Sequence, residues 1–462
     1  MQAGKCGAMS AWSGCDVQGG TPAEGEYRVT AKGGSELQSA ISKAGWRIIP
    51  LLSVGYLFAY IDRVNVSFAS TQMNIDLGFS ATVYGLGAGL FYLAYAMVEI
   101  PSNVLLMRFG ARRWLARIMI MWGLLAISMM FVKTPTQFYT VRFLLGLSEA
   151  GFFPGVMYYL STWFPTKQRG KAMGLFYVAN PLAVFVMGFI SKPLLAMDGL
   201  YDLRGWQWMF LIEGIPPVLI GLAVLAFLPD RPDEVKWLSE GERESLRVAV
   251  AEHPQKHEDH SAGGMLAVLA DKRVLLLTAI YLLTLAAGTT FILSAPAILM
   301  ERTGWDIGHV GWLISAGGLT AAAFMLIGGW ITDHRGERYT VLYVALGFDV
   351  IGYLMIAAAP SAWMVAAGLI LSQIGRGAHS TAQVALWADV LKDRRMAIGA
   401  AAISSVANLG VWLLPIGFGM AKDATGGYTF GLWAFPVMHV LAIVATVVLM
   451  RMVRMKKAGT AA

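Results

Sequence analysis

Residues 333–338 read Asp-His-Arg-Gly-Glu-Arg and directly follow a long apolar stretch of the sequence. Residues 107–112 read Met-Arg-Phe-Gly-Ala-Arg and follow a similar apolar stretch. The glycines of these two segments, Gly110 and Gly336, lie 226 residues apart in a chain of 462 residues. Glycine permits a tight turn between two helices. The recurrence of this turn therefore predicts two similar halves.

The two turns are predicted to form gates at one membrane surface. The first copy has Met107 where the second copy has an acidic residue, so the gate of the first half lacks its charge pair. We expect the second copy to follow the pattern more closely. The predicted gating residues are Gly110, Arg112, Asp333, Gly336 and Arg338.

The composition indicates that most of the chain does not face water. Hydrophobic residues make up 56% of the sequence and charged residues 14%, and the mean hydropathy is +0.58. Soluble domains average roughly 25% charged residues. A soluble protein with a very apolar core would need a few buried elements, whereas apolar runs recur here from residue 46 to residue 453. We therefore expect an all-α protein embedded in a lipid bilayer.

The apolar runs have the length of membrane-spanning helices, which need about 20 residues each. Twelve spans are predicted, over residues 46–69, 80–106, 114–132, 137–163, 170–191, 207–229, 273–299, 308–332, 340–359, 363–388, 396–421 and 429–453. The predicted organisation is a disordered tail (1–45), a six-helix half (46–229), a central loop (230–272), a second six-helix half (273–453) and a short tail (454–462). Cys6 and Cys15 both fall in the first tail, and their spacing matches no common zinc or redox motif.

The distribution of basic residues predicts the orientation. The loops on one side carry Arg108, Arg112, Arg113, Arg117, Lys167, Arg169, Lys171, Arg335, Arg338, Lys392, Arg394 and Arg395, and those on the other side carry Lys133, Lys192, Arg204, Arg302 and Lys422. Loops rich in lysine and arginine remain in the cytoplasm. We therefore expect a multi-pass protein of the inner membrane with both termini in the cytoplasm. Topology accounts for the net charge of +7, and no clustered patch indicates a nucleic-acid partner.

Arg63, Arg142 and Arg376 lie inside predicted spans, where ionisable groups are costly and usually functional. Asp62 and Glu149 accompany the first two. Seven residues separate Arg142 from Glu149, so in one helix both would project from the same face about 10 Å apart. Two structural salt bridges are the simpler interpretation. The functional interpretation is a site for an anion and for protons.

The chemistry of these groups favours the functional interpretation. A guanidinium group keeps its charge and matches a carboxylate through two parallel hydrogen bonds. A carboxyl group can gain or lose a proton when an anion arrives or leaves beside it. Asp62 and Glu149 are therefore predicted to exchange protons, and Arg376 offers a positive site in the opposite half. Polar side chains predicted to contact the anion, each with a purely structural alternative, are His379, Gln383, Ser404, Ser405 and Asn408.

Several motifs together resemble the anion:cation symporter family of the major facilitator superfamily. They are Asp62-Arg63-Val64-Asn65, Glu99-Ile100-Pro101-Ser102-Asn103, Gly110-Ala111-Arg112-Arg113, Arg142-Phe143-Leu144-Leu145-Gly146 and Glu149-Ala150-Gly151-Phe152-Phe153-Pro154-Gly155. The resemblance covers residues 45–455. Within the family, the chain looks most similar to the bacterial branch of tartrate, nicotinate, phthalate and hydroxyphenylacetate permeases. It implies proton-driven uptake of a carboxylate, with the proton as coupling ion and no other cofactor. The C-terminal half matches less specifically.

The resemblance also implies roles for single residues. Asp62 and Glu149 would form the protonation pair, Arg63 would bind the substrate, and Arg142 would tune Glu149 or help to bind the anion. Tyr60, Tyr95 and Asn180 would face the cavity. The alternatives are an organic-anion exchanger or exporter on the same fold, and a membrane-embedded enzyme or sensor, for which no nucleophile–base pair or phosphate loop is found. We expect a monomeric transporter and not an enzyme.

Overall fold

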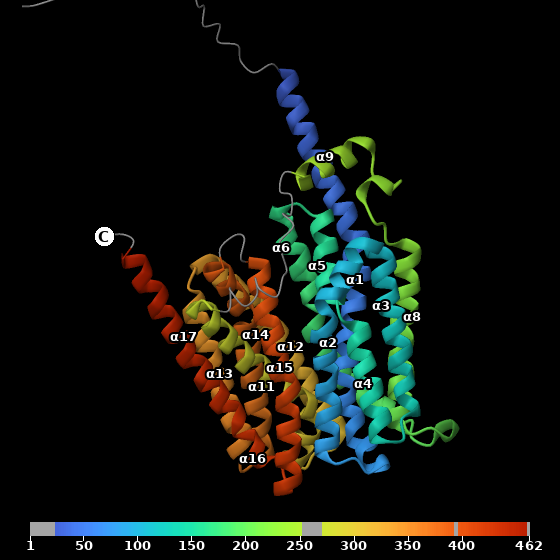
Figure 1. Ribbon diagram of the computed structural model, residues 1–462, viewed down its shortest axis with the longest axis vertical. Coiled ribbons are helices and arrows are strands. Elements are labelled where there is room, and N and C mark those ends of the chain that lie inside the picture. The colour runs from blue at the N-terminus through green and yellow to red at the C-terminus, as the bar shows by residue number, and fades with distance from the viewer. Residues whose placement is uncertain (1–23, 252–269, 392–395, 460–462) are drawn as a thin grey trace, which may run out of the picture.

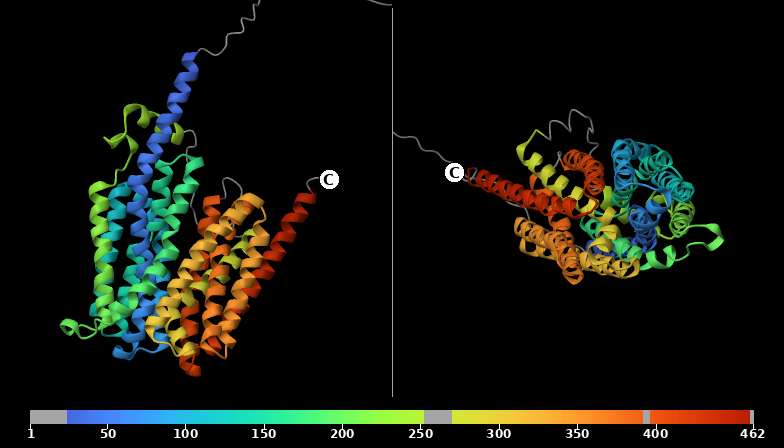
Figure 2. Two further views of the ribbon diagram at one scale, coloured as in Figure 1. Left: turned by 180° about the vertical axis from the view of Figure 1, so that it is seen from behind. Right: turned by 90° about the horizontal axis from the view of Figure 1, so that it is seen from below.

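The computed structural model describes residues 24–251, 270–391 and 396–459. All regular secondary structure in these residues is helical. The helices run roughly along one direction and form two bundles that lie side by side, as Figures 1 and 2 show. The twelve-helix fold predicted from the sequence is confirmed.

The N-half comprises the first six spans. Its helices are α1 (Glu24–Leu77), α2 (Ala81–Phe109), α3 (Ala111–Ser128), α4 (Pro135–Glu149), α5 (Phe152–Trp163), α6 (Thr166–Tyr177), α7 (Ala179–Leu195) and α8 (Gly205–Phe227). Short 3₁₀ turns lie at Met129–Phe131, Leu200–Asp202 and Pro232–Glu234. The fourth span consists of α4 and α5, and the fifth of α6 and α7.

The C-half comprises the last six spans. Its helices are α11 (Lys272–Thr303), α12 (Ile307–Arg335), α13 (Arg338–Ala358), α14 (Ala362–Val390), α15 (Met396–Thr425), α16 (Thr429–Leu432) and α17 (Ala434–Gly459). By length and apolarity, eleven segments of the described residues qualify as membrane spans. The twelfth is α14, which carries Gln373, Arg376, His379 and Gln383 along its length and is polar because it faces the interior of the protein.

The predicted disordered tail is wrong for residues 24–45. Helix α1 begins at Glu24 and extends well beyond the bundle (Figure 1). It is held there by α9 (Glu240–Ala251) of the central loop, whose Glu242 accepts hydrogen bonds of 2.6 Å from both Ser39 and Lys43. Cys6 and Cys15, for which no zinc or redox motif is predicted, lie outside the described residues.

The fourth span is broken, whereas the sequence predicted a continuous helix. Helix α4 ends at Glu149, and Gly151 adopts a left-handed conformation with φ of 90°. A Cβ atom at Gly151 would lie 2.2 Å from Oγ of Ser102, so glycine also permits close approach of α2. The break leaves the Glu149 carboxylate at the end of a helix in the middle of the span Pro135–Trp163. Irregular backbone at this depth is found where it is buried in protein or lines a cavity.

Among the described residues, the buried apolar cores of the two halves are continuous near one end and separate near the other. We call the end that carries α9 the α9 end, and the opposite one the distal end (Figure 1). The core of the C-half near the distal end is continuous with the core of the N-half. Its core near the α9 end, which includes Leu277, Leu342 and Leu386, forms a separate cluster.

Contacts at the distal end explain this closure. The carboxylate of Asp423 in α15 accepts hydrogen bonds from the backbone of Ala81 and Thr82, at 3.0 and 2.8 Å, and so caps α2 across the boundary between the halves. Glycines bring the helices close together here. A Cβ atom at Gly85 would lie 2.3 Å from the carbonyl oxygen of Pro415. The bundle is therefore closed at the distal end.

Candidate transport site

Arg63 of α1 and Glu149 of α4 form an ion pair in the N-half. Nε and Nη2 of Arg63 donate hydrogen bonds of 2.8 and 2.5 Å to the same oxygen, Oε1 of Glu149. The side chain of Glu149 is completely buried, and its other oxygen has no hydrogen-bond partner among the described residues. Arg63 keeps 16% of its side chain exposed. The pair therefore has one buried partner and one partner that remains accessible.

Aromatic rings surround the Arg63 guanidinium. Its Cζ atom lies 5.2 Å from the ring centre of Tyr60 and 5.0 Å from that of Tyr95. The ring centre of Phe91 lies 5.6 Å from Cζ of Arg63 and 4.9 Å from Cζ of Arg142, so this one ring makes cation–π contacts with both arginines. Such contacts stabilise a positive charge away from water by about 0.5–2 kcal/mol.

Arg142 is buried and only partly satisfied. Its exposed fraction is 1%, and its Nε and Nη2 groups have no hydrogen-bond partner among the described residues. The predicted geometry with Arg142 and Glu149 on one helical face does not produce an ion pair between them, because Glu149 is paired with Arg63 instead. Arg142 therefore remains a positive charge with unused hydrogen-bond donors. Such groups are costly to bury without an acceptor.

Asp62 belongs to the same cluster. It is 4% exposed, and its Oδ2 atom has no hydrogen-bond partner in the described part of the chain. It lies close enough to Glu149, Arg142 and Arg63 to interact with all three electrostatically. The structure therefore brings together the four ionisable residues predicted for the N-half.

Glu213 of α8 extends this cluster, and sequence reasoning missed it. The side chain of Glu213 is 5% exposed, and neither carboxylate oxygen has a hydrogen-bond partner among the described residues. Its neighbours are Asn65 and Asp62. The signal that could have found it is an acidic residue within the apolar run of the predicted span 207–229.

A central cavity of about 120 Å³ lies between the halves. A water molecule needs roughly 10–15 Å³ measured in this way, so the cavity has room for several waters or a small solute. Five predicted site residues line it, namely Tyr60, Asn180, Arg376, His379 and Gln383. Tyr95 packs on Arg63 instead. Arg63, Arg142 and Asn408 are not among its lining residues, and the side chain of Asn408 is 9% exposed.

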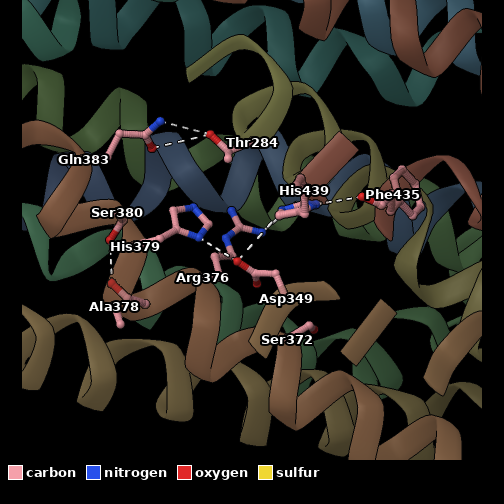
Figure 3. Close-up of polar contacts among 12 residues, drawn as sticks. Thr284, Asp349, Ser372, Arg376, Ala378, His379, Ser380, Gln383, Phe435 and His439 are labelled. Atoms are coloured by element: carbon pink, nitrogen blue, oxygen red, sulfur yellow. Dashed lines mark hydrogen bonds and ion pairs between the residues drawn. The ribbon is translucent and has the colours of Figure 1, made fainter. Parts of the chain in front are cut away.

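The C-half wall of the cavity is polar. Nη1 of Arg376 donates a hydrogen bond of 3.4 Å to the backbone carbonyl of Gly288. The amide of Gln383 donates to Oγ1 of Thr284 at 3.2 Å. Figure 3 shows His379, beside Arg376, in contact with Asp349 of α13. Arg376 therefore places a positive charge on the side of the cavity opposite Tyr60.

The gate of the N-half has an acidic partner that sequence reasoning missed. Asp230 follows α8 and accepts a hydrogen bond of 2.8 Å from the backbone nitrogen of Arg112. A Cβ atom at Gly110 would lie 3.1 Å from the Asp230 carboxylate. Asp230 thus supplies, at the start of α3, a negative charge that Met107 cannot provide. Arg112 and Asp230 are 118 residues apart in the chain, so no local sequence pattern indicates this contact.

The gate of the C-half follows the predicted turn. Gly336 ends α12 in a left-handed conformation with φ of 66°. Arg338 begins α13 and donates a hydrogen bond of 3.0 Å to the carbonyl oxygen of Ala385 in α14. Asp333 is exposed. Both gates lie at the α9 end, where the two halves are separate.

Two bundles of six membrane-length helices, closed together at one end and enclosing a charged cavity, define a membrane transporter. Comparison with known proteins gives the family. The Major Facilitator Superfamily profile matches residues 52–295 and 277–461. The chain belongs to this superfamily.

Two curated relatives match over most of the chain. A putative tartrate transporter of Agrobacterium vitis is 39% identical over 414 residues, covering 89% of this chain and 91% of the relative. A quinolone resistance transporter of Acinetobacter baumannii is 35% identical over 423 residues, covering 92% and 98%. The resemblance to anion:cation symporters is confirmed, and the chain is a transporter and not an enzyme.

The solved structures confirm the fold. A bacterial homologue of the human lysosomal transporter Spinster, in an inward-facing and unoccupied conformation, superposes with a TM-score of 0.72. The alignment covers 88% of this chain and 96% of that one at 16% sequence identity. At this identity the likeness concerns the fold alone.

Proposed function

We propose that the protein imports a small organic acid, bound as its carboxylate, together with protons. The observation that carries the proposal is the contact of Arg63 with Glu149, in which an accessible guanidinium is occupied by a buried carboxylate of the protein itself. A substrate carboxylate is the natural competitor for such a guanidinium. The name of the tartrate transporter relative supports this substrate class.

Exchange of partners on Arg63 supplies the coupling. When the substrate carboxylate takes the place of Glu149 on Arg63, Glu149 loses its counter-ion and takes up a proton, because a buried carboxylate without a partner is costly. Asp62 faces the same group of charges and is the second proton acceptor. When the substrate leaves, Glu149 returns to Arg63 and releases its proton. The proton is the coupling ion, and the chain works as a monomer without a metal or other cofactor.

The orientation follows from charge. The loops at the α9 end carry the majority of the basic residues, so this end faces the cytoplasm and both termini are cytoplasmic. The protein lies in the inner membrane. With its distal end closed, the conformation described here is the cytoplasm-facing one of an alternating-access cycle. The gating residues Gly110, Arg112, Asp333, Gly336 and Arg338 would meet when the cavity opens to the outside.

A second candidate function is export. The observation in its favour is the quinolone resistance transporter, which resembles this chain over as large a share of its length as the tartrate transporter does. Fold alone does not determine the direction of transport. The positive charges of the N-half cluster and Arg376 favour anions over cationic drugs in either direction.

The experiment that tests the proposal uses purified protein in proteoliposomes. Thermal stabilisation is first screened with L-tartrate, nicotinate, phthalate, gluconate and norfloxacin, because a ligand that binds only the folded state raises its unfolding temperature. Uptake of the stabilising compound is then measured with an inward proton gradient. The import proposal predicts stabilisation by one of the four small acids, L-tartrate, nicotinate, phthalate or gluconate, and accumulation of that acid against its gradient. Stabilisation by norfloxacin alone, with transport driven by the opposite gradient, would instead establish the exporter.

A further inference from the structure

A second group of buried ionisable residues lies in the C-half, away from the cluster around Arg63. Asp349 of α13 is 1% exposed, His379 of α14 is 8% exposed and His439 of α17 is 1% exposed. Nδ1 of His379 lies 2.8 Å from Oδ2 of Asp349, and Nε2 of His439 lies 3.9 Å from the same oxygen. Figure 3 shows both rings converging on this carboxylate. All three residues line the central cavity, so protons can reach them through its water.

The hydrogen bonds determine which ring nitrogen of His439 carries its hydrogen. Nδ1 lies 2.8 Å from the carbonyl oxygen of Phe435. A carbonyl oxygen can only accept a hydrogen bond, so Nδ1 is the donor. A neutral His439 therefore directs the lone pair of Nε2 towards Asp349. The Asp349 carboxylate is also a hydrogen-bond acceptor, so Nε2 of His439 and the carboxylate face each other with no hydrogen atom between them.

An added proton removes this conflict. If the proton binds Nε2 of His439, the ring becomes a cation that attracts the Asp349 carboxylate. If the proton binds the carboxyl group of Asp349, that group can donate a hydrogen bond to Nε2. Oδ1 of Asp349 has no hydrogen-bond partner among the described residues, which leaves room for such a proton. The group is therefore incomplete in its deprotonated form.

The other titratable groups near this cluster include one cation. Arg376, which is on α14, lies beside both His379 and His439 (Figure 3). The ring of Tyr353 on α13 lies 5.1 Å from that of His439, and Tyr281 of α11 lines the same cavity. The part of α12 that lines the cavity consists of Gly318, Ala321 and Met325, which do not titrate. Arg376 and Asp349 are therefore the charges that set the electrostatics here.

We propose that Asp349, His379 and His439 form a proton-binding site that controls the affinity of Arg376 for the substrate anion. In the deprotonated state the charge of Asp349 offsets that of Arg376, and the C-half wall attracts an anion weakly. One bound proton leaves a net positive charge beside the cavity and strengthens binding. The C-half thereby adds a second proton dependence of anion binding to the one that Glu149 supplies. This inference rests on the proposed function for the nature of the ligand.

The test compares two substitutions that act in opposite directions. Binding of L-tartrate, or of another acid that stabilises the wild type, is measured across about pH 5.5 to 8, where linkage to one proton changes the affinity by up to about tenfold per pH unit. Asp349→Asn removes the offsetting charge, so at high pH it should bind the acid more tightly than the wild type does, and the pH dependence that remains should be the one due to Glu149. His439→Gln cannot take the proton, so binding should stay weak at low pH. His309→Gln, at an exposed residue of the distal end, is the matched control and should retain the wild-type dependence.

A measurement without substrate separates this inference from the proposed function. Solid-state NMR of ¹⁵N-histidine-labelled protein resolves the histidine side chains. The signal that disappears in His439→Gln belongs to His439, and the signal that disappears in His379→Gln belongs to His379. The inference predicts that these two histidines titrate together between about pH 5 and 8 and that Asp349→Asn changes both titrations. It is overturned if both rings stay neutral throughout, or if both substitutions leave the pH dependence of binding unchanged. Failure of every acid to bind would overturn the proposed function, while the NMR result would still decide the proton site.

Discussion

Arg63 makes two hydrogen bonds to Glu149 from one edge of its guanidinium group. A lysine in its place keeps the charge but presents a single ammonium group in place of the planar fork. We expect Arg63→Lys to lose one charge-assisted hydrogen bond to the substrate carboxylate, about 1.5–3 kcal/mol, and so to weaken affinity by about ten- to a hundredfold. Isothermal titration of the purified protein with the transported acid measures this.

The matched control for this prediction is Arg204→Lys. Arg204 lies at the distal end with 58% of its side chain exposed, where ion pairs contribute little. Its substitution should leave the affinity within about twofold of wild type, since surface changes cost within about 0.5 kcal/mol. Equal weakening in both variants would contradict a role for Arg63 in binding.

At the residue scale, the sequence identified the right charges but not all of their partners. Arg63, Arg142, Asp62 and Glu149 stand out because charges within apolar runs are rare. The contact of Arg63 with Glu149, in place of one within α4, depends on how two helices are rotated against each other. A single sequence does not encode that rotation in any local pattern.

The break between α4 and α5 gives a prediction at the scale of an element. Alanine at Gly151 would pay about 1–2 kcal/mol for the left-handed backbone, and its Cβ atom would also clash with Ser102. Gly78→Ala is the matched control, because its φ is 64° and nothing lies within 4 Å of its Cβ position. We expect Gly151→Ala to lower the unfolding temperature in detergent more than Gly78→Ala does. Equal losses would show that the contact with Ser102 does not matter.

The contact of α9 with α1 gives a second prediction at this scale. Hydrogen bonds from Lys43 and Ser39 lower the pKa of Glu242 to about 2. Because the pKa is lowered in the folded state, the contact is stable above the ordinary pKa of about 4.3 and is lost as the pH falls through about 2. Hydrogen exchange in α9 should therefore be unchanged from pH 8 to 5, after correction for intrinsic rates, and should rise at lower pH.

Glu242→Gln should raise exchange in α9 at neutral pH. Glu244→Gln is the control, since Glu244 is exposed and pairs with Arg247 within the same helix. Similar exchange in the two variants would contradict a role for Glu242 in holding α9. The sequence could not show that α1 extends outward to meet α9, since residues 24–45 carry no apolar run.

At the scale of the whole molecule, Asp423 holds the distal end closed by capping α2 across the two halves. Asp423→Ala should shift the protein towards the outward-open state, because it removes the acceptor of these hydrogen bonds. Spin labels on either half of the distal end, in a variant with Cys6 and Cys15 replaced by serine, should show a longer distance in the mutant. Lys192→Ala, which removes a more exposed contact of 3.5 Å, should have a smaller effect, and an unchanged distance in Asp423→Ala would refute the role of this cap.

The global architecture was the most predictable feature, because it depends on properties summed over the whole chain. Span length, the distribution of basic residues and the repeated turn around Gly110 and Gly336 all indicate two six-helix halves. The conformation could not be predicted, since a transporter visits several with one sequence. The placement of Asp230 at the gate and of Asn408 outside the cavity depends on packing between elements far apart in the chain.

Proton-driven uptake by wild type and by Glu149→Gln tests the central claim most directly. Glutamine can still accept a hydrogen bond from Arg63 but cannot exchange a proton. In proteoliposomes with an inward proton gradient, the wild type should accumulate the acid, and Glu149→Gln should exchange it across the membrane without accumulating it. Accumulation by Glu149→Gln at the wild-type level would contradict the account.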